Sequence, residues 1–397
     1  MRSIQEPPAR PDVPAASAAI SAVQPTTETE RLHALDAIRG AAILGVLFAY
    51  AIWNLGGPPE ETWTALDHFI ARFMDVFVDS KCYTLFACLF GLGVAQQWRR
   101  WEAAGQDPLP LHVRRMGFLL VVGVLHALLL RNGDILAPYA ICGLVLFLFR
   151  SLPTRAIAVA SVVALVAHWA VAIVAARMGH SWPARPEAAS GNYFADNWAW
   201  LRYWYATGPL LYWPETLGLM LSGVWAARAT MVEQLSTSPK TPLVLGAAAA
   251  LAVLTRIAVD TFHGVGLASW LRPTARQAIY EWSAWSLAAA YAITLILILR
   301  RNPSRLWPLR ATGRMAFTNY LMQPVVIVPL CLAFGLFDTI TPSRGLWIAL
   351  PLGALQVAFS VWWLRRHSLG PLEWLWRRVT YGRAPWGLGA RRSPGAG

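Results

Sequence analysis

The sequence is poor in charged residues. Asp, Glu, Lys and Arg make up only 14% of its 397 residues, whereas soluble globular domains typically contain about 25%. Hydrophobic residues make up 56% of the chain, and several apolar runs approach the roughly 20 residues that a helix needs to cross about 30 Å of hydrocarbon. These features exclude an ordinary soluble domain and predict a polytopic helical membrane protein.

Cysteine is also scarce. The four cysteines all lie in apolar runs, none belongs to a C-x-x-C pair, and no His/Cys cluster has the spacing of metal ligands. We therefore expect the cysteines to be small buried residues, and we expect no metal site. A nucleic-acid partner is not expected either, because the net charge of +13 comes from basic residues that flank the apolar runs instead of forming a groove or a tail.

The apolar runs predict an all-α fold, a transmembrane helical bundle of about ten spans. The second span belongs to a longer unit, residues 66–97. The first half of this unit mixes apolar and charged residues, which is typical of an interfacial or re-entrant helix. The ten expected spans are 37–55, 82–95, 116–130, 135–149, 156–176, 209–227, 242–259, 278–299, 315–337 and 345–364.

The two ends of the chain differ from this transmembrane domain, which we place at residues 31–381. Residues 1–30 are rich in Pro, Ala, Ser and Thr and have no apolar core of signal-peptide length, so we expect a disordered tail. Residues 382–397 are expected to form a second disordered tail.

Basic residues set the expected topology. Lys and Arg number 24 in the tails and loops on the side of the two termini, and 8 in the loops on the other side. Because Lys and Arg are enriched in cytoplasmic loops, we expect both termini in the cytoplasm and the bend at residues 131–134 on the outer face.

Residues 114–150 have the clearest pattern of a transmembrane helical hairpin. His126 lies inside the first arm, and Asp134 begins the second arm, where it is expected to cap the helix. Ionisable groups inside a membrane are costly and are functional candidates by default. A histidine beside a carboxylate is the usual general base. The alternative is that His126 bonds between helices and Asp134 is only a cap.

Three polar residues near the first two spans each have two interpretations. Asp36 and Arg39 share a helix face. They either anchor the first span at the inner interface or face a cytoplasmic cavity and hold an anionic cofactor. Lys81 either extends to the interface along its alkyl chain or is a fixed cation at the outer mouth of a cavity, near Asp75 or Asp79.

Three further polar residues lie inside later spans. Glu215 is in the middle of an apolar run and is expected to face protein or water. Asn319 and Gln323 are four residues apart on one face of the ninth span. They either form interhelical hydrogen bonds or line a ligand pocket.

Aromatic residues gather in two places. Nine of them lie between residues 193 and 213, which is typical of an aromatic belt at the outer interface, with a platform for sugar or lipid head groups as the alternative. Residues 370–378 predict an amphipathic helix on the inner leaflet, anchored by tryptophans.

Five motifs, in order along the chain, resemble those of the YeiB family of bacterial inner-membrane proteins. They are Arg31-x4-Asp36-x2-Arg39-Gly40, the segment Lys81 to Gly93, Gly123-x2-His126 followed by Gly133-Asp134-Ile135-Leu136-x2-Tyr139, and the two C-terminal segments 313–323 and 370–376. The resemblance implies a multi-pass protein of the bacterial inner membrane.

That family is distantly similar to membrane acyltransferases of the heparan-glucosaminide acetyltransferase type, which transfer an acetyl group from cytosolic acetyl-CoA to an amine or a hydroxyl. The similarity rests chiefly on the D-x-x-R-G opening, Asp36 to Gly40. Such enzymes often place His or Asn eleven residues after the arginine. Here that position is Tyr50, which becomes a candidate substrate-binding residue.

The resemblance implies that the donor is an acyl-CoA, such as acetyl-CoA, and that the acceptor is lipid-linked or exported. His126 would be the general base, Asp134 would orient it, and Lys81 would be the cation on the oxyanion side. The remaining candidates are Asp36, Arg39 and Arg314 for the cofactor, and Tyr50, Glu215, Asn319 and Gln323 for the substrate.

Two other classes of function stay open at this point. One is a proton-coupled transporter or exporter in which His126, Asp134 and Glu215 relay protons. The other is a non-catalytic membrane scaffold or sensor. The sequence contains no inverted repeat that is evident by eye, and such a repeat would favour the transporter.

Overall fold

The computed structural model describes residues 33–130, 134–178, 192–264, 266–302 and 304–382. The expected tail at 1–30, the bend at 131–133 and nearly all of the tail at 382–397 lie outside these ranges. In chain order the elements are α2 (His33–Trp53), η1 (Glu60–Thr62), α3 (Ala65–Phe77), α4 (Lys81–Ala103), α5 (Pro108–Leu129), α6 (Leu136–Leu146), η2 (Phe147–Phe149), α7 (Thr154–Arg177), α8 (Tyr193–Leu211), α9 (Trp213–Arg228), α10 (Met231–Thr237), α11 (Thr241–Thr261), α12 (Arg272–Arg301), α13 (Trp307–Arg314), α14 (Ala316–Phe334), α15 (Pro342–Leu364) and α16 (Pro371–Tyr381).

Within the described chain, eight helices are long and apolar enough to cross a membrane. They are α2, α3 with α4, α5, α7, α11, α12, α14 and α15. The two other expected spans correspond to shorter helices, α6 with η2 and the 16-residue α9. The predicted all-α, polytopic transmembrane bundle is confirmed.

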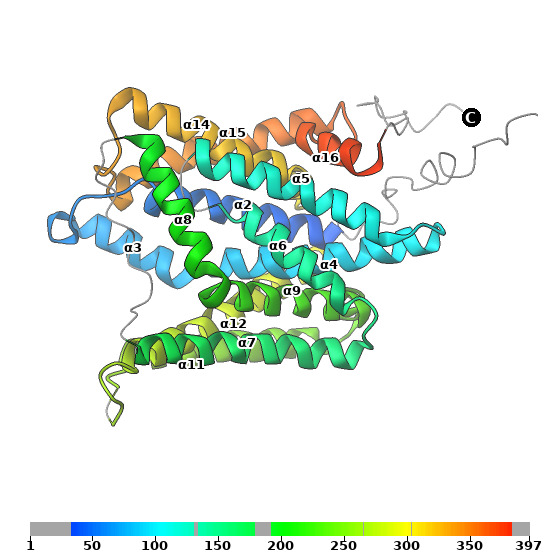
Figure 1. The fold of residues 1–397 in the computed structure, drawn as a ribbon, viewed down its shortest axis with the longest axis horizontal. Helices are drawn as coiled ribbons and strands as arrows, with labels where there is room; N and C mark the ends of the chain where they lie inside the picture. Colours follow the sequence, from blue (N-terminus) through cyan, green and yellow to red (C-terminus); the bar gives the residue numbers. More distant parts are fainter. Residues whose placement is uncertain (1–32, 131–133, 179–191, 265, 303, 383–397) are drawn as a thin grey trace, which may run out of the picture.

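The helices are arranged around α2 and α4, which run through the middle of the bundle in Figure 1. Helices α14, α15 and α16 lie along one side, and α7, α11 and α12 lie along the opposite side. Helices α5, α6 and α8 cross the front of the view. The C-terminal helix α16 and the start of α5 are at the same end of the bundle, which the charge pattern assigns to the cytoplasm.

The long second unit divides into two helices at Ser80, whose φ of 63° is in the left-handed region. Thr64 and Asp67 form a capping box at the start of α3. Ile70 and Met74 of α3 are buried against the bundle, whereas Phe69 and Phe73 are exposed on its other face. The first half of the unit is thus a separate helix whose exposed face combines these phenylalanines with the polar side chains of His68 and Arg72.

Glycine allows α2 and α13 to cross in backbone contact. A Cβ atom on Gly40 would overlap the carbonyl oxygen of Leu309, and one on Gly313 would overlap that of Asp36. Close backbone approach through small residues is the usual means of tight helix packing in membranes. This crossing holds the start of α2 against the start of α14.

A glycine substitution tests this crossing. Gly40→Ala is expected to lower the free energy of unfolding by roughly 1–3 kcal/mol, because the added methyl group forces two backbones apart. The control is Gly117→Ala in α5, where an added Cβ meets no atom within 4 Å and where alanine is the better helix former. Thermal unfolding in detergent micelles measures both variants. Equal midpoints for the two variants would contradict the close packing at Gly40.

Candidate functional site

A cavity of about 380 Å³ lies between α2, α4, α5, α6, α14 and α16. Its volume is within the range of about 300–1,000 Å³ that is usual for small-molecule sites. One part of its wall is apolar and includes Phe86, Leu89, Phe90 and Leu119. The other part is rich in charged side chains.

The charged part of the wall is positive overall. Two acidic residues, Asp36 and Glu373, face five arginines there. Arginine binds phosphate and carboxylate groups through parallel hydrogen bonds, so this wall favours an anionic ligand. The five arginines are Arg39, Arg100, Arg115, Arg314 and Arg377.

The three residues predicted to hold the cofactor lie together at this wall. Asp36 and Arg39 form an ion pair, with 3.0 Å between Oδ1 and Nη1. Both residues also line the cavity. The ion pair and a position in the cavity wall are therefore compatible. Arg314 lines the cavity too, and its Nη2 donates to the backbone oxygen of Ser368. The glycine crossing of α2 and α13 brings Arg314 beside the other two residues.

Helix α16 forms part of the same wall. Trp376 stacks on Arg115, with the guanidinium carbon 3.6 Å from the ring centroid, and its Nε1 donates to the backbone oxygen of Arg115. Its ring centroid is also 5.0 Å from that of Phe317. The amphipathic helix predicted at 370–378 therefore turns one of its tryptophans into the protein, where it closes the cavity.

Glu373 of α16 caps α14. Its Oε1 accepts hydrogen bonds from the backbone N–H groups of Phe317 and Thr318, and its Oε2 accepts from the Thr318 hydroxyl at 2.6 Å. These bonds satisfy N–H groups at the start of α14 that have no partner within the helix. Burial raises the pKa of Glu373 above its ordinary value, because the charged form is poorly solvated there.

His126 and Asp134 lie together just outside the cavity, next to Tyr320 and Ile135 of its wall. Both side chains are almost fully buried, and Nδ1 of His126 is 3.2 Å from Oδ1 of Asp134. These two atoms are at ion-pair distance without the alignment of a hydrogen bond. Among the described residues, Nε2 of His126 has no hydrogen-bond partner. A buried imidazole with an open nitrogen and a neighbouring carboxylate is suited to accept a proton.

Asp134 also caps α6, as predicted. Its Oδ1 accepts from the N–H of Leu136 and its Oδ2 accepts from the N–H of Ala137. A Cβ atom on Gly123 would lie 2.8 Å from Asp134 Oδ2 and closer still to Ala137 N. Glycine in α5 thus lets the start of α6 approach, which explains the Gly123-x2-His126 motif.

Tyr320 separates His126 from the cavity. The two rings are stacked, with centroids 5.3 Å apart and an angle of 30° between their planes. The Tyr320 hydroxyl accepts a hydrogen bond from the N–H of Ile135. Both Tyr320 and Ile135 line the cavity, and His126 does not. The cavity therefore runs from the arginines to the tyrosine that covers His126.

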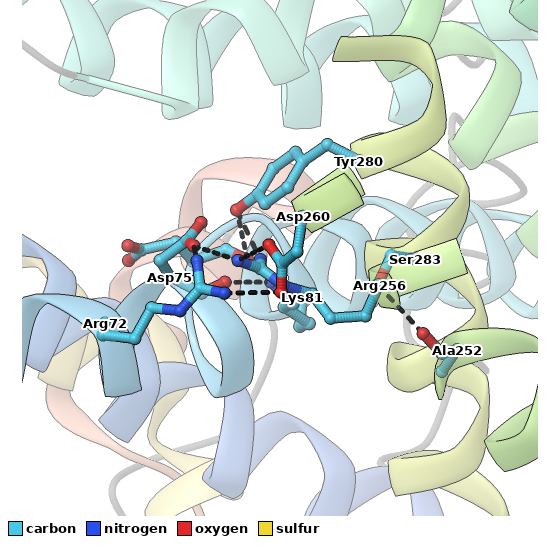
Figure 2. A network of polar contacts seen from close by, with 9 residues as sticks. Arg72, Asp75, Lys81, Ala252, Arg256, Asp260, Tyr280 and Ser283 are labelled. Atoms are coloured by element: carbon cyan, nitrogen blue, oxygen red, sulfur yellow. Dashed lines mark hydrogen bonds and ion pairs between the residues drawn. The ribbon is translucent and has the colours of Figure 1, made fainter. Parts of the chain in front are cut away.

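Lys81 lies in a different cluster, shown in Figure 2. Its Nζ donates to the backbone oxygen of Asp75 at 2.6 Å and lies 4.8 Å from the ring centroid of Tyr280. Asp75 accepts hydrogen bonds from Arg72 and Arg256 in the same cluster. Lys81 is thus near Asp75, as predicted, but it is not among the residues that line the cavity. We assign it no role in the chemistry there.

The four residues predicted to bind the substrate do not line the cavity either. Asn319 donates to Ser360 Oγ, and Gln323 donates to the backbone oxygen of Ile43 and to Gln356 Oε1. These contacts fit the interpretation that Asn319 and Gln323 form interhelical hydrogen bonds instead of lining a ligand pocket.

Tyr50 and Glu215 complete this group. Tyr50 donates to the backbone oxygen of Leu130, at the C-terminal end of α5. Glu215 lies with His168 and Glu281 in a third cluster, so the structure does not bring it to His126 and Asp134.

Three cavity residues have no distinct signal in the sequence. Arg115 fits the pattern of a basic anchor at a helix end, and Tyr320 and Glu373 lie inside the family-like segments 313–323 and 370–376 without any spacing that marks them. Their shared wall exists only because α14 and α16 fold back against α5.

The bundle and its arginine-lined cavity define a polytopic helical membrane protein with an internal site. Residues 226–383 match the family model described as "Protein of unknown function (DUF418)". This match, together with the relatives described next, supports a YeiB-type protein with a domain of unknown function, as the motifs predicted. The matched segment contributes Arg314, Tyr320 and Glu373, whereas His126 and Asp134 come before it.

Two relatives cover most of the chain. It is 29% identical to "Uncharacterized protein YxaH" of Bacillus subtilis (strain 168) in an alignment that spans 91% of this chain and 97% of that protein. It is 27% identical to "Uncharacterized protein YeiB" of Escherichia coli (strain K12), over 88% of this chain and 96% of that protein. No solved structure matches the chain.

The capping role of Asp134 can be measured. Asp134→Ala is expected to lower the free energy of unfolding by about 1–3 kcal/mol, because it leaves two buried backbone N–H groups without an acceptor. The matched control is Asp107→Ala, which removes an exposed cap from the start of α5 and should cost nearer 0.5–1 kcal/mol. Unfolding in detergent micelles compares the two. An equal or smaller loss for Asp134→Ala would contradict the proposed cap.

The raised pKa of Glu373 predicts a pH dependence of stability. Above the ordinary carboxyl pKa of 4.5, and up to the raised folded value, the folded state binds more protons than the unfolded state. Stability from this group therefore falls as pH rises through that window. Glu373→Gln should remove this fall in a series of unfolding curves, whereas the exposed control Glu61→Gln should retain it. Parallel pH profiles for wild type and Glu373→Gln would contradict the prediction.

Proposed function

We propose that this protein is an acyltransferase of the bacterial inner membrane that transfers an acyl group from acyl-CoA to a hydroxyl or amine. The observation that carries the proposal is the single cavity, which begins at a cluster of arginines and ends at Tyr320, directly against His126 and Asp134. A donor bound at one end would place its reactive end near a buried base.

The side chains of the cavity wall suit the successive parts of a CoA thioester. The phosphates of CoA are anions, and Arg39 and Arg314 would hold them at the cytoplasmic end. The pantetheine arm and acyl chain would then lie along the apolar wall that includes Leu89 and Leu119. Such a division between a charged end and an apolar length is typical of small-molecule sites that bind amphipathic ligands.

The transfer itself needs one base and no other co-reactant. The acceptor oxygen or nitrogen attacks the thioester carbonyl carbon, a new C–O or C–N bond forms, and the C–S bond breaks. The acceptor proton passes to the open Nε2 of His126 and is returned to the leaving thiolate, which departs as free CoA. Asp134 stabilises the charged imidazole while it holds the proton.

The acceptor is proposed to be lipid-linked or exported, because His126 lies in the half of α5 nearer the outer face. The cavity spans the distance between a cytoplasmic donor and that base. Helix α16 covers the cytoplasmic part of this route with Trp376.

Binding and turnover of radiolabelled acetyl-CoA test the proposal. The purified protein in detergent should bind acetyl-CoA, and Arg314→Ala should weaken binding tenfold or more, because a hydrogen bond to a charged group is worth about 1.5–3 kcal/mol. The control is Arg344→Ala, an exposed arginine near the outer start of α15, which should bind as the wild type does. With inner-membrane lipid extract as acceptor, His126→Ala should slow release of free CoA about 10²–10⁴-fold.

The outcomes separate the three classes of function. A transporter or a scaffold would release no free CoA from acetyl-CoA, with or without the extract. Full activity of His126→Ala would refute the role of the histidine, and unchanged affinity of Arg314→Ala would refute the placement of the donor.

A further inference from the structure

A second polar cluster, with two buried members and the half-buried Glu215, lies on the side of α4 that faces away from the cavity. His168 of α7, Glu215 of α9 and Glu281 of α12 each offer one ligand atom, and these atoms lie within 4.8 Å of one another. His168 is 0% exposed and Glu281 is 3% exposed. None of the three residues lines the cavity, so the cluster is separate from the proposed acyl-transfer site.

The two glutamates are held in place by neutral donors. Trp169 Nε1 donates to Glu281 Oε2 at 2.7 Å, and Gln277 Nε2 donates to Glu281 Oε1 at 3.2 Å. Trp285 Nε1 donates to Glu215 Oε1 at 3.3 Å. Hydrogen bonds of this kind orient the carboxylates of metal sites, and a carboxylate oxygen that accepts one bond keeps a second lone pair for coordination.

The cluster has an unbalanced charge. The charged neighbours of Glu215 are Glu281 and His168, and within the described chain neither glutamate forms an ion pair with a lysine or an arginine. Two carboxylates beside one imidazole leave a net negative charge even when the histidine is protonated. Burying such a charge in a membrane bundle is costly. A divalent cation would neutralise both carboxylates with the histidine neutral.

We propose that His168, Glu215 and Glu281 bind one divalent transition-metal ion, for which Zn²⁺ is the best match. Imidazole and carboxylate together are typical zinc ligands, with bonds of about 2.1 Å. In a tetrahedral site such bonds separate two ligand atoms by about 3.4 Å. The observed 3.3 Å between His168 Nε2 and Glu281 Oε1 fits that spacing. Three protein ligands leave a fourth position for water or a substrate group, as in catalytic zinc sites.

The ion would tie together three helices from two parts of the chain. The segment that matches DUF418, residues 226–383, contributes only Glu281. His168 and Glu215 come from helices before it. The metal site would therefore fasten the N-terminal helices to the DUF418 segment, on the side of the bundle that the cavity does not use.

Metal binding to the full-length protein tests the proposal. Protein purified in detergent and stripped with a chelator should bind one equivalent of Zn²⁺ in a calorimetric titration. His168→Ala and Glu281→Gln should each weaken binding at least tenfold. The matched controls are His263→Ala and Glu233→Gln, both at exposed positions, and these should bind Zn²⁺ as the wild type does.

The absorption spectrum of Co²⁺ bound to the wild-type protein provides a second test. This test does not depend on whether the variants fold. Co²⁺ bound by nitrogen and oxygen should show visible d–d bands without a thiolate charge-transfer band. A thiolate band would assign the metal to cysteines and overturn the proposal. The proposal is also overturned if the wild type binds no Zn²⁺, which would mean that the carboxylates share a proton, or if folded ligand variants bind as tightly as the controls.

Discussion

The carboxylate of Asp134 is the interaction on which the proposed site depends. One oxygen accepts from the N–H of Leu136 and is also near His126, and the other accepts from the N–H of Ala137. The same group therefore starts α6, keeps α5 beside it and lies next to the imidazole. Buried ionisable groups are retained in membranes only where such partners exist. The cap and the base are thus one structural unit rather than two features that happen to be close.

The cavity connects this unit to the opposite end of the bundle. Two of its arginines, Arg39 and Arg314, come from helices that meet through backbone contact at Gly40 and Gly313, so their positions depend on helix packing. The far end is defined by Tyr320, which contacts His126 on one side and the cavity on the other. This continuous space would allow the proposed donor at the arginines to reach the proposed base beside Tyr320.

The sequence predicted the helices far better than the contacts between them. Apolar runs must form helices in a membrane, and a turn followed by Asp134 at the start of an apolar run marks a cap, so both predictions follow from local rules. Contacts between distant segments could not be predicted in this way. Lys81, for example, lies beside Tyr280, which is 199 positions away in the sequence. The same holds for His168 and Glu281, which are 113 positions apart. Spacing along one helix carries no information on which face of a distant helix it will meet.

The central claim is that one ligand extends from the arginines to the tyrosine that covers His126. An electron cryomicroscopy structure of the protein with a non-hydrolysable thioether analogue of acetyl-CoA measures this most directly. We expect phosphate density beside Arg39 and Arg314, and density for the acyl end against Tyr320. Analogue bound elsewhere on the protein, or a cavity filled by side chains in its presence, would contradict the account.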